Sequence, residues 1–247
     1  MTANIRPAGN QYFYVTAADP AGPWSEPILV EQEGIDPSLF FDDDGQVYYT
    51  STAGNGIHQC TIDPATGKIL IPTRHIWPGS GGRYCEAPHL FKFNDFYYLL
   101  AAEGGTEYGH MATIARAKSP WGPFESCPRN PILTHRNRGG HPIQGTGHAD
   151  FIQDHRGKWW AVFLAFRPTG GDFHHLGRET FLAPVEWQDD WPIIAGRSGP
   201  GTVEMEMEAD LPDWQPGSGE ATRDSFAQPQ LLPAWNFLRI LTLRIIP

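Results

Sequence analysis

A three-fold sequence repeat is the feature that most constrains the fold of this chain. The segments DPSLFFDDDGQVYYTST from Asp36, APHLFKFNDFYYLLAAE from Ala87 and HADFIQDHRGKWWAVFLAF from His148 share one plan. Each has an apolar run, a polar turn and a second run rich in aromatic residues, which is the pattern of a β-hairpin. The repeats are about 50 to 60 residues apart, the length of a four-stranded propeller blade with an insertion. The sequence therefore predicts an all-β fold of the β-propeller type.

A second recurring element consists of turns that contain Asp-Pro or Ser-Pro. They are AADPAGPWSEP at 17–27, TIDPATGKIL at 61–70 and RAKSPWGPFES at 116–126. Each turn leads into a further strand. The first of them is preceded only by NQYFYVT, which matches the later part of a repeat. We therefore expect the chain to start within a blade and the propeller to be incomplete.

The composition narrows the classes of partner. An aromatic content of 13%, with 27 Gly and 23 Pro, favours many short strands joined by turns over long helices. The net charge of −10 and the absence of a basic cluster argue against a nucleic acid or an anionic membrane surface as partner. The sequence has no apolar run of about 18 residues, the length expected of a membrane-spanning helix. A neutral or cationic partner is expected.

The cysteines indicate the compartment. Cys60, Cys85 and Cys127 are far apart and form no C-x-x-C pair for zinc or redox chemistry. We expect them to be buried free thiols. The start, MTANIRPAGNQYF, has no apolar signal-peptide core. These features predict a cytoplasmic location.

Two carboxylates stand at the start of predicted inner strands. Asp36 precedes Pro37, and Glu86 precedes Ala87-Pro88 in what looks like the same register. Inner strands of a propeller line its central channel, so both side chains are expected in one cavity. A carboxyl group of raised pKa and a second carboxylate suit the cleavage of a glycosidic bond. The structural alternative is that both residues only form turns at strand starts.

Other polar residues leave alternatives open. His148 is expected at the matching place in the third repeat, either in the cavity or as a buried histidine bonded to the backbone. Arg178, in LGRETF, suits a substrate contact or a surface ion pair equally well. The acidic run Asp42 to Asp44 fits the tip of a hairpin better than a calcium loop.

At these residues the chain resembles glycoside hydrolase family 43, in its β-xylosidase and α-L-arabinofuranosidase branch. The resemblance covers about residues 10 to 195 and includes GIDPSLFFDDDG, GGRYCEAPHLFK, GTGHADF and LGRETFLAPVEW. It implies a five-bladed propeller that hydrolyses xylosides and arabinosides with inversion and needs no cofactor. It makes Glu86 the general acid and Asp36 the residue that tunes its pKa. Thr106 and Arg178 become sugar contacts, and His148 lies beside a central water or calcium ion, as a possible metal ligand.

The sequence also departs from that family pattern. The first blade, with the Asp that serves as general base, has no counterpart, so the resemblance assigns no base and implies impaired activity. We expect an incomplete propeller at 1–205, then a linker and the truncated start of a β-sandwich at 206–247. Exposed blade faces would favour a homodimer or higher oligomer. The expected partner is a small oligosaccharide, and the alternative function is a propeller that binds pentoses without turnover.

Overall fold

The structure is a computed structural model that describes residues 2–5, 11–54, 56–194 and 201–207. The chain divides into two compact units, Met1–Glu208 and Ala209–Pro247. The expected linker and sandwich start fall almost wholly outside the described residues, so this domain assignment stays a prediction. None of the described segments forms a helix with the length and apolar character of a transmembrane span.

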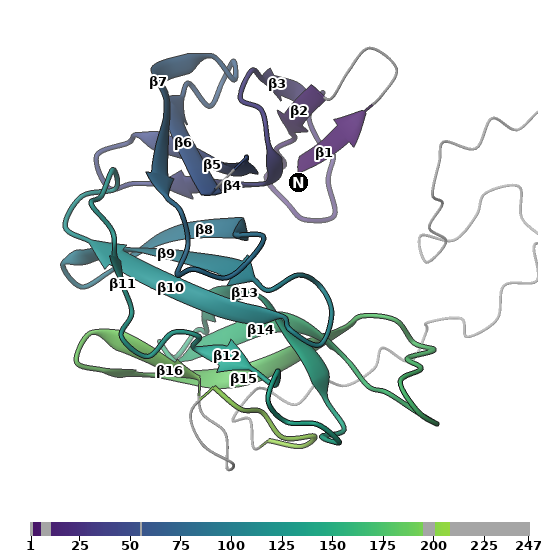
Figure 1. The fold of residues 1–247 in the computed structure, drawn as a ribbon. Helices are drawn as coiled ribbons and strands as arrows, with labels where there is room; N and C mark the ends of the chain where they lie inside the picture. Colours follow the sequence, from purple (N-terminus) through teal and green to yellow (C-terminus); the bar gives the residue numbers. More distant parts are fainter. Residues whose placement is uncertain (1, 6–10, 55, 195–200, 208–247) are drawn as a thin grey trace, which may run out of the picture. The chain divides into compact units, whose positions relative to one another are not determined.

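The described part of the first unit is built from antiparallel sheets that follow one another along the chain (Figure 1). The first sheet has three strands, β1 (Thr2–Ile5), β2 (Gln11–Tyr14) and β3 (Ile28–Val30). The second has four, β4 (Ile35–Phe41), β5 (Val47–Ala53), β6 (Gly56–Ile62) and β7 (Ile69–Trp77). Each strand of these sheets pairs with the strand next to it in sequence, which is the order within a propeller blade.

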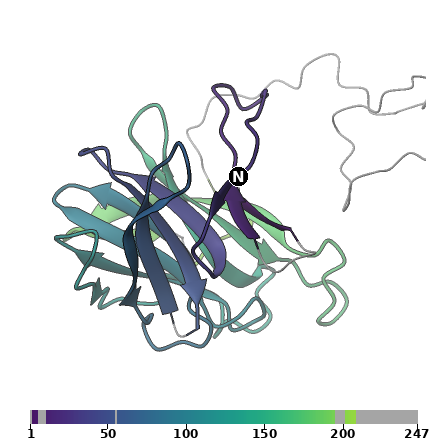
Figure 2. The ribbon, with the colours of Figure 1, turned by 90° about the horizontal axis from the view of Figure 1, so that it is seen from above.

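Two further sheets complete the set. The third contains β8 (Glu86–Phe93), β9 (Phe96–Glu103), β10 (Met111–Ala117) and β11 (Glu125–Ser126), and β12 (Leu133–Thr134) also pairs with β10. The fourth contains β13 (Gln144–Gln153), β14 (Trp159–Phe166), β15 (Glu179–Gln188) and β16 (Trp191–Ile194). Seen from above, the strands of the sheets are strongly twisted (Figure 2). The predicted all-β fold of the propeller type is confirmed for the described residues.

The predicted turns form as their residue types require. Gly45 and Gly157 adopt φ values of 82° and 78°, and their N–H groups donate to the carbonyls of Asp42 and Asp154. In the Asp-Pro turns, Asp19 Oδ1 accepts the N–H of Ala21 at 2.8 Å. Asp63 Oδ1 accepts the N–H of Ala65 at 2.9 Å in the same way. Asp19 therefore serves its own turn.

Aromatic side chains join the third and fourth sheets. Phe93 stacks on Trp187 with ring centroids 4.1 Å apart, and Tyr98 meets Trp187 edge to face at 5.0 Å. Trp159 meets Phe93 edge to face at 5.5 Å. Packing of large rings between sheets contributes both buried area and favourable ring geometry. Aromatic side chains of β8, β9, β14 and β15 thus pack the third sheet against the fourth.

Each of β4, β8 and β13 carries a bulge at the same place. The pairing shifts between Ile35 and Ser38, between Glu86 and His89, and between Gly147 and Asp150. One residue in each bulge has a left-handed conformation: φ is 50° at Asp36, 52° at Ala87 and 51° at His148.

This geometry corrects the predicted register. Asp36 is equivalent to Ala87 and His148, whereas Glu86 is equivalent to Ile35 and lies one residue earlier in its strand. The repeats that start at Asp36, Ala87 and His148 already align these three residues, and matching acid with acid moved Glu86 by one position.

Candidate active site

Equivalent residues of three blades meet beyond the bulges. Ser38 Oγ lies 3.3 Å from His89 Nδ1, and the same nitrogen lies 3.6 Å from Asp150 Oδ2. These residues follow the left-handed residues Asp36, Ala87 and His148 by two positions in their strands. The inner strands therefore converge, as the propeller prediction requires.

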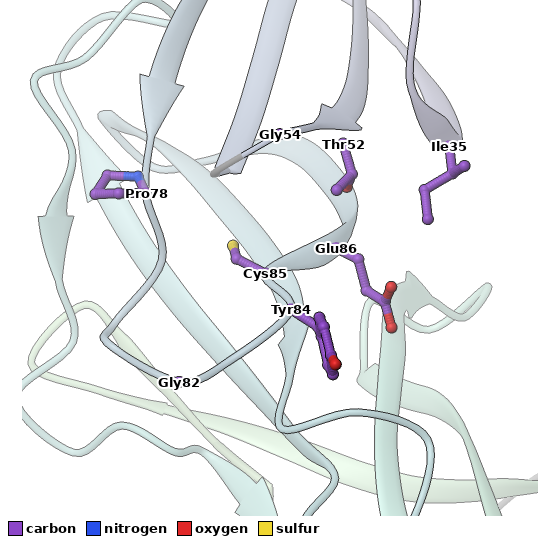
Figure 3. A pocket seen from close by; sticks show the side chains of 8 residues that line it. All are labelled: Ile35, Thr52, Gly54, Pro78, Gly82, Tyr84, Cys85 and Glu86. Carbon is purple, nitrogen blue, oxygen red and sulfur yellow. The ribbon is translucent and has the colours of Figure 1, made fainter.

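A pocket of about 440 Å³ opens at the start of β8. Its lining comes from the second sheet and from the loop before β8: Ile35, Thr52, Gly54, Pro78, Gly82, Tyr84, Cys85 and Glu86. In Figure 3 the side chains of Glu86 and Tyr84 project to the same side of this loop, and Cys85 points the other way. Tyr84 is exposed and has a φ of 55°, a conformation that is rare and strained for a bulky residue.

Glu86 is half-buried, and its pKa is raised above the ordinary value. Burial is the largest cause, because desolvation disfavours the charged form. The carboxylate of Asp36 raises the pKa further, and the guanidinium of Arg178 opposes both effects. Glu86 can therefore keep a proton to a higher pH than an exposed glutamate, which is what a general acid needs.

Two histidines extend the site toward the interior. His148 and His110 lie edge to face with ring centroids 6.5 Å apart. Burial lowers the pKa of both, that of His110 to about 4, and Asp36 acts against this trend at His148. His110 Nδ1 lies 3.0 Å from the carbonyl oxygen of Gly145. Both rings are thus neutral near pH 7.

The remaining predicted residues, Arg178 and Thr106, have exposed side chains. Arg178 is exposed directly before β15, close enough for its charge to act on Glu86, His110 and His148. Thr106 is exposed in the turn between β9 and β10. Next to it, the Cα of Gly105 approaches Arg83 and Tyr84 so closely that a Cβ would lie 3.4 Å from each side chain. The structure thus brings Asp36, Glu86, His148 and Arg178 within electrostatic range and puts Thr106 beside the loop of Tyr84.

The side chains around His148 do not fit a directly bound metal ion. Calcium takes about six to eight oxygen ligands, and the described residues contain no group of three or more His, Cys, Asp or Glu side chains suited to a metal. Nδ1 of His148 and Nε2 of His110 are buried and have no hydrogen-bond partner within the described part of the chain. Such atoms suit an ordered water.

Sequence reasoning missed several residues of this region. Ser38, His89 and Asp150 could have been found by aligning the repeats on their first residues, because each is the third residue of its repeat. Tyr84 and His110 gave no signal, since neither lies in a repeated motif. The prediction of buried free thiols is confirmed for Cys60, Cys85 and Cys127. The cytoplasmic location inferred from them stays a prediction.

A propeller that holds a glutamic acid of raised pKa beside an aspartate, in an open pocket, has the arrangement that glycoside-hydrolysing sites use. The sequence comparison is specific: the model of glycosyl hydrolases family 43 matches residues 2–192. The chain belongs to this family.

Curated relatives and solved structures agree with the assignment. A non-reducing end α-L-arabinofuranosidase of Bacteroides ovatus is 45% identical over 92% of this chain and 42% of its own length. A xylosidase/arabinosidase of Butyrivibrio fibrisolvens is also 45% identical, over 91% of this chain and 46% of its own. The crystal structure of a xylan β-1,4-xylosidase from Bacillus halodurans superposes with a TM-score of 0.84 at 35% identity, covering 94% of this chain and 47% of that one. The chain thus spans less than half the length of these relatives.

Proposed function

We propose that this chain provides the acid side of the active site of an exo-acting, inverting glycosidase. Its substrates would be oligosaccharides ending in β-xylose or α-L-arabinofuranose. One observation carries the proposal: Glu86, with a raised pKa, lies in an open pocket within electrostatic range of Asp36. The names of the relatives, an arabinofuranosidase and a xylosidase/arabinosidase, support the substrate class.

The proposed roles follow from charge and position. Protonated Glu86 donates its proton to the glycosidic oxygen as the bond to the sugar breaks. The carboxylate of Asp36 favours the protonated form of Glu86. Arg178 and Thr106 bind sugar hydroxyls at the rim, and His148 holds a water or a hydroxyl at the inner end.

No general base is assigned among the described residues. Asp19 is engaged in its own turn through the N–H of Ala21. No other described carboxylate is assigned to activate water. Loss of a general base costs about 100- to 10,000-fold in rate, so we expect slow hydrolysis by these 247 residues. A small nucleophile such as azide, which can replace the activated water, should accelerate it.

No cofactor is needed for this mechanism. A calcium ion at the propeller centre is retained only as a proposal in which water supplies most of its ligands and His148 contacts one of these waters. Calcium would then raise the melting temperature and EDTA would lower it. A melting temperature that neither calcium nor EDTA changes would show that no calcium ion is bound.

The proposal is tested by product analysis on natural linkages. Purified chain is incubated with xylobiose and with an arabinofuranosyl-substituted xylo-oligosaccharide, with and without azide, and proton NMR follows the anomer released. The expected result is release of terminal pentose, with inversion in the reaction with water. Tight binding of a pentose without any hydrolysis, even with azide, would instead identify a sugar-binding propeller.

A further inference from the structure

A second glutamate, Glu103, lies behind the pocket in a place that the mechanism above does not use. It ends β9, and its side chain is fully buried, with 0% exposed. A buried carboxylate is costly unless hydrogen bonds compensate the lost hydration. The partners of Glu103 therefore indicate what it does.

Those partners lie mainly in the loop that forms the pocket wall. Glu103 Oε1 accepts the backbone N–H of Ser80 and the hydroxyl of Thr113, each at 2.7 Å. Oε2 accepts the backbone N–H of Gly82. Hydrogen bonds to an ionised acceptor are shorter and stronger than neutral ones. One side chain thus fixes two amides of a loop without regular secondary structure.

The loop is shaped to fit closely around this carboxylate. A Cβ on Gly82 would lie 2.5 Å from Glu103 Oε2 and 2.4 Å from Met111 Cε. Gly79 has a φ of 90°, and a Cβ there would lie 3.1 Å from Glu103 Cδ. Any side chain at these two positions would displace the loop from Glu103.

The same loop carries the acid. Pro78, Gly82, Tyr84 and Cys85 line the pocket, and Glu86 follows directly as the first residue of β8. Glu86 pairs in register with Ala102, the neighbour of Glu103 in β9. Beyond Glu103, the N–H of Gly104 donates to the carbonyl of Arg83 at 2.7 Å. The end of β9 therefore binds the loop at Ser80, Gly82 and Arg83, before Tyr84, and pairs with Glu86 after it.

We propose that Glu103 is a positioning residue, which holds the 78–85 loop as a wall of the pocket and thereby sets the burial of Glu86. It does not touch the substrate. A carboxylate is needed because three donors converge on its two oxygens, and an amide at the same place would turn an NH₂ group toward a backbone N–H. The inference rests on the proposed function only for the kinetic consequence.

The test uses Glu103→Gln, with Glu125→Gln as the matched control. Glu125 is an exposed glutamate on β11 that pairs with Arg116 at 3.6 Å, away from the loop. Hydrogen exchange of the peptide covering 78–86 should be faster by about tenfold or more in Glu103→Gln, because losing one hydrogen bond changes an opening equilibrium by about that factor. It should be unchanged in Glu125→Gln. Unchanged exchange in Glu103→Gln would overturn the proposal.

A second readout follows the acid itself. The carboxyl ¹³C signal of Glu86 is identified by its loss in Glu86→Gln. It is then titrated in the unaltered chain and in Glu103→Gln. A displaced loop exposes Glu86, so the pKa of Glu86 should fall in Glu103→Gln, since burial is the main cause of its elevation. An unchanged titration would show that Glu103 supports the fold without positioning the acid.

Kinetics separate this inference from the proposed function. Glu103→Gln should lower kcat/KM on xylobiose by about 10- to 100-fold, part of the contribution of a general acid, and should add little in the Glu86→Gln background. Equal losses in both backgrounds would overturn the positioning role. If the unaltered chain hydrolyses no pentoside, the proposed function fails, and the exchange and titration results still decide the role of Glu103. If Glu103→Gln does not fold, Gly82→Ala replaces it. The added methyl group would collide with the Glu103 carboxylate and so displace the loop while leaving Glu103 unchanged.

Discussion

The carboxylate of Asp36 raises the pKa of Glu86, although the two residues belong to different blades and to different positions of their bulges. The left-handed residue Asp36 and the first residue of β8 reach one site because the inner strands converge. This pairing supplies the first prediction. Asp36→Asn removes the negative charge, so the pKa of Glu86 falls. A general acid works only while protonated, so the alkaline limb of the pH profile of kcat/KM should move to lower pH.

Arg178 should act in the opposite direction. Its guanidinium lowers the pKa of Glu86, so Arg178→Met should move the same alkaline limb to higher pH. If Arg178 also binds a sugar hydroxyl, KM should rise about tenfold, the value of one charged hydrogen bond. Arg167→Met is the control, because Arg167 forms a two-point ion pair with Glu179 at 2.9 and 2.6 Å. A shift of the alkaline limb in the same direction in Asp36→Asn and in Arg178→Met would contradict the electrostatic account.

Buried His110 should make stability depend on pH. Its pKa is about 4 in the folded state and about 6.5 when unfolded, so between these values the unfolded chain binds the extra proton. Stability is therefore fully present above about pH 6.5 and is lost as the pH falls toward 4, by up to about 3 kcal/mol from this residue. Urea unfolding at several pH values should show this slope. His110→Phe should flatten it, and an equal slope in the variant would assign the effect to other groups.

Self-association is the next prediction. The side chains of Leu29 on β3 and Ile35 on β4 are half exposed, at 51% and 49%. Strand β3 is an edge strand of the described three-stranded sheet. Exposed apolar edges favour pairing with another chain. Sedimentation velocity should therefore show a dimer or higher oligomer, and Leu29→Lys should shift it toward monomer because a charge blocks edge pairing. A monomer at all concentrations would end this proposal.

The sequence predicted the hairpins because their signals are local. Gly45 and Gly157 stand where a turn needs a positive φ, and aromatic runs follow them. It misplaced the register of Glu86 against Asp36, because the bulges involve an Asp, an Ala and a His, which share a backbone conformation and no side-chain chemistry. It could not find Glu103, whose partners include the backbone amides of Ser80 and Gly82. Interactions with main-chain groups leave little trace in residue type.

The central claim is that Glu86 donates the proton to the leaving group, and one comparison tests it most directly. Glu86→Gln is assayed on xylobiose, whose leaving sugar needs protonation, and on dinitrophenyl β-xyloside, whose leaving group does not. The account predicts a fall of kcat/KM by at least about 100-fold on xylobiose and little change on the dinitrophenyl substrate. Equal losses on both substrates, or full activity on xylobiose, would contradict it.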